Sequence, residues 1–233
     1  MSTKAQKQAE SNILTFLRVR PSKIPSGYFT QDELEQNSLS FNLPKPGKNE
    51  LSEHINNSKL QHNFHFNGII DANATQDEVF KKVGVAAVQN AIEGFNSTIF
   101  AYGQTGSGKT FTLTGGPTDY KDRGIIPRAI SMLYNEYRNR SDLQLKAYIS
   151  YLELYNEKGY DLLDPAHDNK ALEELPKVSM LEDEHGNFHL KNLSMNLAET
   201  EEDALNLLFM GDTNRAIAET PMNMVRFLRF FLY

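Results

Sequence analysis

The amino-acid sequence predicts an α/β fold in which helices and strands alternate around a buried strand and the glycine-rich turn that follows it. Residues 97–102 form a compact apolar run that predicts a buried strand. The glycine-rich segment 103–108 follows directly and leads into a polar–apolar segment that predicts the start of a helix. Elsewhere apolar side chains recur with helical spacing in some segments and alternate strictly in others, which is typical of helices that flank a sheet.

Length and composition exclude several classes of protein. The 233 residues allow one substantial domain or at most two small ones, and 14 Phe with 10 Tyr can build a sizeable core. The absence of cysteine excludes disulfides and thiolate metal sites and fits a reducing compartment. A net charge of −6 argues against a nucleic-acid partner. No apolar stretch approaches the roughly 20 residues that span a bilayer, and no secretory signal is evident, so we expect an intracellular protein without a membrane span.

The N-terminal part predicts short strands among loops. Residues 1–12 are polar, and we expect them to be disordered. A strand is predicted at 13–19, where Pro21 stops it. Short apolar alternations at 39–43 and at 62–67 predict a further strand and an edge strand or hairpin arm.

Two helices are marked by their first turns. Thr75 followed by Glu78 is a capping-box pattern, in which each side chain satisfies the backbone N–H of the other residue. Apolar side chains keep helical spacing from there to Gly94, which is a natural helix stop. Pro127 suits the first turn of a second helix that runs to about Arg140.

The C-terminal third predicts strands and one helix. Strict alternation over 143–151 predicts a long strand, and segments 178–181 and 188–193 flank a hairpin turn at 185–187.

Thr200 with Asp203 caps a final helix to about Ile217. The last residues, 224–233, are apolar and lack turn chemistry. Three readings stay open for them: an extra strand, a turn of helix, or a sequence unrelated to the domain before them.

Segment 103–110, GQTGSGKT, fits the phosphate-loop pattern G-x-x-x-x-G-K-[S/T]. The glycines let the backbone turn so that several N–H groups face the phosphates. Lys109 offers a positive charge to the β and γ phosphates, and Thr110 places its hydroxyl on Mg²⁺. We therefore predict binding of a purine nucleoside triphosphate with magnesium. The predicted nucleotide-binding residues are Gly103, Gln104, Thr105, Gly106, Ser107, Gly108, Lys109 and Thr110, with Thr110 also the metal ligand.

Binding alone is not hydrolysis, because phosphoryl transfer also needs a carboxylate for the metal shell and a group that positions water. Asp164 follows an apolar pair and is a candidate for that carboxylate, although its neighbours Asp161 and Pro165 favour a loop end. No catalytic residue is assigned in this chain.

Five segments occur in an order and spacing that resemble kinesin motor domains over residues 13–223. The phosphate-loop segment FNSTIFAYGQTGSGKTFTLTG is the most specific of them. The others are ILTFLRVRP, FNGIIDANATQDEVF, YISYLELYNEKGYDLLDP and GDTNRAIAETPMN. The sequence around Gly103 and Tyr160 is similar to that of a ciliary or flagellar subgroup of that family.

The resemblance implies a P-loop NTPase-type fold, with a mixed central sheet flanked by helices, and an ATP-driven motor that moves along microtubules. It implies ATP and Mg²⁺ as ligands. It implies that the adenine lies against Arg18, Arg20, Pro21 and Phe111. The implied location is the cytoplasm and the cytoskeleton, with a cilium or flagellum for the subgroup.

The chain departs from the family pattern at its C-terminal end. Asn223 corresponds to the first residue of the switch motif N-x-x-S-S-R-S-H, but Met224, Val225 and Arg226 follow it. The second switch, D-x-A-G-x-E, is absent from the sequence. We therefore expect a C-terminally truncated, partial motor domain at 13–223 and a divergent apolar tail at 224–233. Strands missing from the sheet would leave unpaired edges and uncovered apolar surface.

Three functions remain open at this point. The chain is a partial catalytic core of a microtubule motor, in a truncated, frame-shifted or alternatively spliced form; or it is a non-motile nucleotide-binding module; or it is a non-functional fragment. For the first, we expect weak nucleotide binding, negligible hydrolysis by this chain and weakened contact with microtubules.

Overall fold

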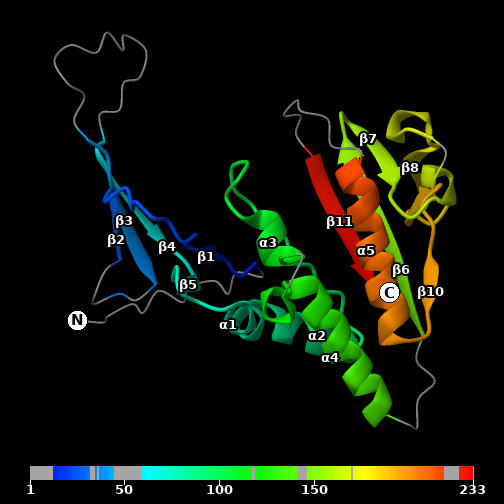
Figure 1. Cartoon of the computed structure of the whole chain (residues 1–233), viewed down its shortest axis with the longest axis horizontal. Coiled ribbons are helices and arrows are strands. Elements are labelled where there is room, and N and C mark those ends of the chain that lie inside the picture. Colours follow the sequence, from blue (N-terminus) through cyan, green and yellow to red (C-terminus); the bar gives the residue numbers. More distant parts are fainter. Residues whose placement is uncertain are drawn as a thin grey trace, which may run out of the picture.

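The computed structural model describes residues 13–31, 35, 37–44, 59–116, 119–140, 146–168, 170–217 and 226–232. Helices and strands together confirm the α/β class, and the described strands form three separate sheets (Figure 1). The disorder predicted for 1–12 lies outside the described residues. No helix in the described part of the chain is long and apolar enough to cross a membrane.

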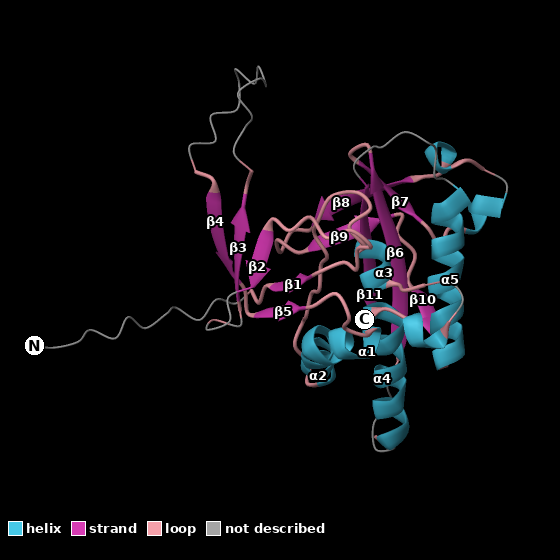
Figure 2. Ribbon diagram, turned by 60° about the vertical axis from the view of Figure 1, so that its left-hand side comes forward, coloured by secondary structure: helices cyan, strands magenta, loops and turns pink. Residues whose placement is uncertain are grey.

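The N-terminal strands form two of these sheets. Strand β1 (Phe16–Arg18) pairs in parallel with β5 (Gly68–Ile70). Strands β2 (Phe29–Gln31), β3 (Ser38–Asn42) and β4 (Gln61–His65) form an antiparallel meander that projects from the rest of the molecule (Figure 2). The strands predicted near 13–19, 39–43 and 62–67 are confirmed, whereas β2 and β5 were not predicted.

One continuous helical segment follows β5. It consists of α1 (Gln76–Val79), a π-helical turn (Phe80–Gly84) and α2 (Val85–Ile92). The predicted capping box is confirmed: Glu78 N–H donates to Thr75 Oγ1 at 3.3 Å, and Thr75 N–H donates to Glu78 Oε2 at 2.7 Å. The start of this helix is therefore fixed by side chains of its own first turn.

The strand predicted at 97–102 is wrong. The structure assigns no strand to this segment, and large side chains in it are exposed, with exposed fractions of 73% for Phe100 and 95% for Tyr102. An apolar run forms a buried strand only when neighbouring strands pair with it, and no described strand does so here. The apolar composition of 97–102 therefore does not by itself indicate a strand, because it carries no information about pairing strands.

Helix α4 (Ile125–Asn139) packs on both sides and joins two hydrophobic cores. Ile130 and Tyr134 belong to a core with the six-stranded sheet. Ile125 and Leu133 belong to a second core with α1, α2 and β5. The predicted helix at Pro127 is confirmed, and its first turn begins two residues earlier.

The third sheet holds six strands. The hairpin predicted around 185–187 is confirmed, and the long strand β6 continues to Tyr155, beyond the predicted end at 151; residues 141–145 lie outside the described residues. The strands are β6 (Ala147–Tyr155), β7 (Lys158–Asp161), β8 (Lys177–Glu182), β9 (Phe188–Lys191), β10 (Asn196–Ala198) and β11 (Arg226–Leu232).

The C-terminal tail contributes β11 to this sheet. Residues 226–232 pair antiparallel with β6, from Arg226 opposite Tyr155 to Leu232 opposite Ile149 (Figure 1). Of the readings left open for 224–233, the structure shows a strand over the described residues 226–232.

Helix α5 (Glu201–Ile217) packs against β6. Its predicted start is confirmed, because Asp203 N–H donates to Thr200 Oγ1 at 3.1 Å and Thr200 N–H donates to Asp203 Oδ2 at 2.9 Å. Gly211 lies directly on the ring of Tyr151, which is fully buried and donates its hydroxyl to Asp212 at 2.7 Å. Burial raises the pKa of this tyrosine, so the hydroxyl stays a donor.

Gly211→Ala tests this packing. On helix propensity alone the change would stabilise α5 by about 1 kcal/mol. A Cβ at this position would lie 2.0 Å from Tyr151 Cδ1, so we expect a net loss of about 1–3 kcal/mol in the free energy of unfolding. Urea unfolding measures the sign. Asn206→Ala, at an exposed position of the same helix, is the control and should change little. Stabilisation by Gly211→Ala would contradict the close contact.

Candidate nucleotide-binding site

Segment 103–110 forms a tight turn that only glycines allow. Gly103, Gly106 and Gly108 have φ values of 155°, 79° and 99°. A Cβ on Gly108 would have open space around it, so the constraint at that position is the left-handed backbone and not the room available. The turn ends at Lys109, where α3 (Lys109–Leu113) begins. The expected glycine-rich turn followed by a helix is thus present.

This turn offers backbone donors. Ser107 N–H donates to Gln104 O at 3.1 Å. The N–H groups of Thr105, Gly106 and Gly108 donate to no acceptor among the described residues. Successive N–H groups in such a turn form a concave site for anions. The loop is therefore chemically suited to phosphate oxygens.

Two cationic side chains are bound to the carbonyl groups of the same loop. Lys109 Nζ donates to Gly103 O at 2.8 Å and to Gln104 O at 3.0 Å. Arg20 Nη1 donates to Gly106 O. Both charges therefore lie on the loop itself, where they favour an anionic ligand.

Beside the loop, an arginine and an aromatic ring form an open platform. The guanidinium carbon of Arg18 lies 5.5 Å from the centroid of the Phe111 ring, which is a cation–π distance. The Phe111 side chain keeps an exposed fraction of 42%. Arg18 Nη1 also donates to Thr112 Oγ1 at 2.8 Å, and partial burial lowers the pKa of this guanidinium. One ring face is thus held in place while part of the ring stays open to a planar ligand.

The structure brings most of the sequence-predicted residues together. Arg18 and Phe111 meet each other, and Arg20 meets the loop. Pro21 is exposed and adjoins Arg20 in the chain. Thr110 is exposed in the first turn of α3, and its hydroxyl makes no hydrogen bond to the described residues. A free hydroxyl fits a ligand for a hard cation such as Mg²⁺.

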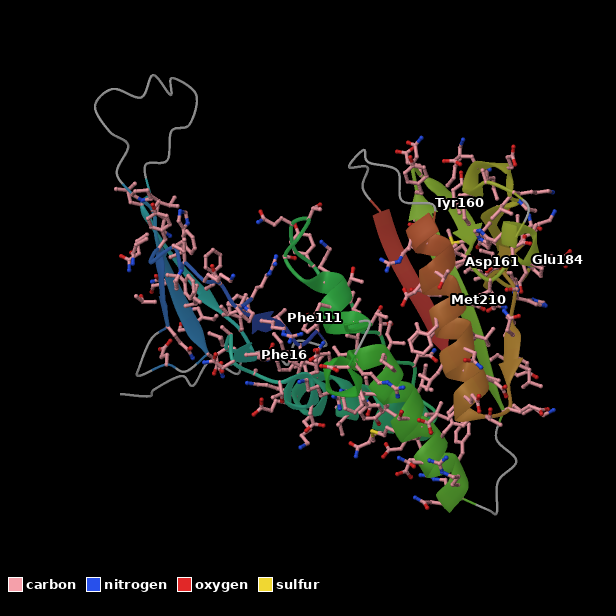
Figure 3. All side chains as sticks on the ribbon, viewed as in Figure 1. Phe16, Phe111, Tyr160, Asp161, Glu184 and Met210 are labelled. Carbon is pink, nitrogen blue, oxygen red and sulfur yellow. The ribbon has the colours of Figure 1, made fainter. Side chains whose placement is uncertain are left out.

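The carboxylates considered in the sequence have other partners. Asp164 Oδ1 accepts the N–H of Ala166 at 2.8 Å, at the start of the 3₁₀ turn Pro165–Asp168. Asp161 accepts the N–H of Leu163 and of Ser194. Figure 3 shows Asp161 in the half of the molecule built on the six-stranded sheet, whereas Phe111 lies in the other half. Asp164 is therefore a loop end, as its neighbours indicated.

Sequence reasoning missed Gln76. This side chain has an exposed fraction of only 4% and contacts both Arg18 and α3. A signal was present, because Gln76 stands at helical spacing from Val79 and Phe80, both of which face the core. A polar residue on the buried side of a helix needs hydrogen-bond partners.

Comparison with known proteins identifies the family. The family model of the kinesin motor domain matches residues 18–226. Kinesin-like protein KIF9 of Mus musculus is 36% identical over 91% of this chain, and kinesin-like protein KLP1 of Chlamydomonas reinhardtii is 37% identical over 91%. The chain spans about a quarter (26%) of the length of each of these relatives.

Solved structures agree on the fold. A fast kinesin superposes with a TM-score of 0.76 at 24% identity, covering 94% of this chain and 58% of that one. A structure of kinesin 6 superposes with a TM-score of 0.73 at 20% identity, covering 94% and 66%. With the family match over most of the chain and the relatives above 30% identity, this chain belongs to the kinesin motor domain family.

Proposed function

We propose that this chain binds ATP with Mg²⁺ at residues 103–110 and is the nucleotide-binding part of an ATP-driven microtubule motor. The observation that carries the proposal is the position of the Arg18–Phe111 platform beside a loop with open backbone donors. A phosphate loop alone would accept many anions. A platform for a planar ring at its side favours a nucleotide.

In this proposal the loop residues hold the phosphates. Lys109 exchanges its bonds to Gly103 O and Gln104 O for the β and γ phosphates, and the open N–H groups of Thr105, Gly106 and Gly108 donate to the same oxygens. Thr110 Oγ1 is the protein's ligand for Mg²⁺, which when bound supplies charge neutralisation at the phosphates.

The base lies against the other residues of the site. The Phe111 ring stacks on the adenine, and Arg18 supports the ring by its cation–π contact. Arg20 and Pro21 border the same space, with Arg20 fixed to the loop at Gly106 O.

The motor function and the partner come from the family. The solved fast kinesin is described in terms of its ATPase mechanism and its interactions with microtubules. For this chain we propose a microtubule partner and a place on the cytoskeleton in the cytoplasm, with a cilium or flagellum as the finer proposal. The division into a partial motor domain at 13–223 and a divergent tail at 224–233 belongs to the same proposal.

Lys109→Ala should remove most of the ATP affinity. The variant loses the positive charge that faces the β and γ phosphates. Losing hydrogen bonds from a charged group of this kind should lower the affinity for ATP about 100-fold. Isothermal titration calorimetry measures the change. Lys121→Ala is the matched control, because its side chain is exposed and pairs only with Asp119 among the described residues. Equal affinity for Lys109→Ala and the unchanged chain would show that the loop is not the site.

Thr110→Ala should weaken ATP binding only when magnesium is present. We expect a loss of about tenfold with Mg²⁺, since one ligand of the ion is removed, and little change with EDTA. Thr213→Ala on α5, an exposed threonine whose hydroxyl donates to Phe209 O, is the control. The same loss with and without magnesium would exclude the metal-ligand role.

The 233-residue chain by itself should show negligible microtubule-stimulated hydrolysis. Its sequence contains neither N-x-x-S-S-R-S-H nor D-x-A-G-x-E, which supply the water-positioning and γ-phosphate contacts in the family. Phosphate release with and without polymerised tubulin measures this, beside a complete kinesin motor domain. Turnover comparable to that of the complete domain would overturn the expectation.

A further inference from the structure

Gln76 joins four separate segments of the chain through one amide group. Its Oε1 accepts a hydrogen bond from Arg18 Nη1 at 3.0 Å. Its Nε2 donates to Phe111 O at 2.7 Å and to Asp122 O at 3.1 Å. These bonds connect α1 with β1, with α3 and with the 3₁₀ turn Tyr120–Asp122, over 35 to 58 residues of sequence.

Only an amide satisfies all three partners. A guanidinium can only donate and a carbonyl can only accept, so the group between them has to accept once and donate twice. A carboxylate in its place would keep the bond to Arg18 and lose both donations. A thioether of the same length would lose all three. The partners also fix which end of the amide is the oxygen.

The position of Gln76 is itself fixed. It is the first residue of α1, directly after the N-cap Thr75 and inside the capping box that Thr75 and Glu78 form. With an exposed fraction of 4%, the side chain is too buried for a bound ligand to touch. Whatever Gln76 contributes to binding therefore passes through the residues it holds.

Those residues are the two members of the platform. Arg18 is held by Gln76 on one side and by Thr112 Oγ1 on the other, and its guanidinium lies near the Phe111 ring. The backbone of Phe111 is held by the same amide. Gln76 thus contacts both members of the platform and, with Thr112, sets the distance between the cation and the ring.

We propose that Gln76 is a positioning residue for the base-binding side of the site. It holds Arg18 and Phe111 together so that the base of a nucleoside triphosphate stacks on the ring, and it does not act on the phosphates. This inference rests on the proposed function, because it requires that the nucleotide bind beside this platform.

The test separates base binding from phosphate binding in the full 233-residue chain. Calorimetry measures the affinity for ATP and, separately, for inorganic tripolyphosphate, which occupies the loop but has no base. For Gln76→Met we expect about a tenfold loss for ATP and less than a twofold change for tripolyphosphate. Gln76→Glu keeps the partner of Arg18 and should show an intermediate loss for ATP.

Phe111→Ala provides the second readout. If Gln76 acts through the ring, Gln76→Met in the Phe111→Ala background should cause less than a twofold further loss for ATP. Additive losses would overturn the proposal. Equal losses for ATP and tripolyphosphate would also overturn it, because they would indicate that Gln76 merely holds α3 and its loop.

Two further outcomes separate a failure of the proposed function from a failure of the role assigned to Gln76. Failure of the unchanged chain to bind either ATP or tripolyphosphate would contradict the proposed function itself. Circular dichroism checks the fold of each variant, and unfolding of both Gln76→Met and Gln76→Glu at the assay temperature would assign Gln76 to stability alone and overturn the proposal.

Discussion

Helix α4 contributes side chains to both hydrophobic cores of the molecule. Ile130 and Tyr134 pack with β6, β7 and α5, while Ile125 and Leu133 pack with α1, α2 and β5. Neighbouring residues on a helix, such as Leu133 and Tyr134, point about 100° apart, so one helix can serve two cores only when apolar residues occupy both directions. The described strands do not connect the two halves into one sheet. The double packing of α4 therefore holds the half with the phosphate loop against the half with the six-stranded sheet.

The position of the phosphate loop depends on helix α4. Helix α3 starts at the loop. A short connecting segment, residues 114–124 (the excursion), separates α3 from α4. Gly124 N–H donates to Thr114 O at 2.9 Å, and Gly116 N–H donates to Asp122 O at 3.0 Å, so the excursion leaves and returns at nearly the same place. A Cβ on Gly124 would lie 2.4 Å from Leu113 O, which leaves no room for a larger residue. Gln76 links α3 to β1 and also donates to Asp122 O in the same excursion.

Local chemistry could be predicted from the sequence, and distant pairing could not. The capping boxes at Thr75 and Thr200, the hairpin near 186 and the glycine-rich loop each depend on residues a few positions apart. The apolar run at 97–102 carried no information about its partners, so its strand was predicted wrongly. The three-residue strands β2, β5 and β10 are too short for a period to be seen. Arg18 and Phe111 were placed by family resemblance, whereas Gln76 was missed because its partners lie 35 to 58 residues away.

The backbone hydrogen bonds that join the two ends of the excursion between α3 and α4 have a practical consequence. Because backbone hydrogen bonds join Thr114 to Gly124 and Gly116 to Asp122, the distance between the two helices does not depend on how many residues lie between Gly116 and Asp119. Extra residues at that point cost only the loop-closure entropy, which grows slowly with length. We therefore expect that a peptide tag or a fluorophore inserted at this point lies near segment 103–110 and leaves α3 and α4 in place.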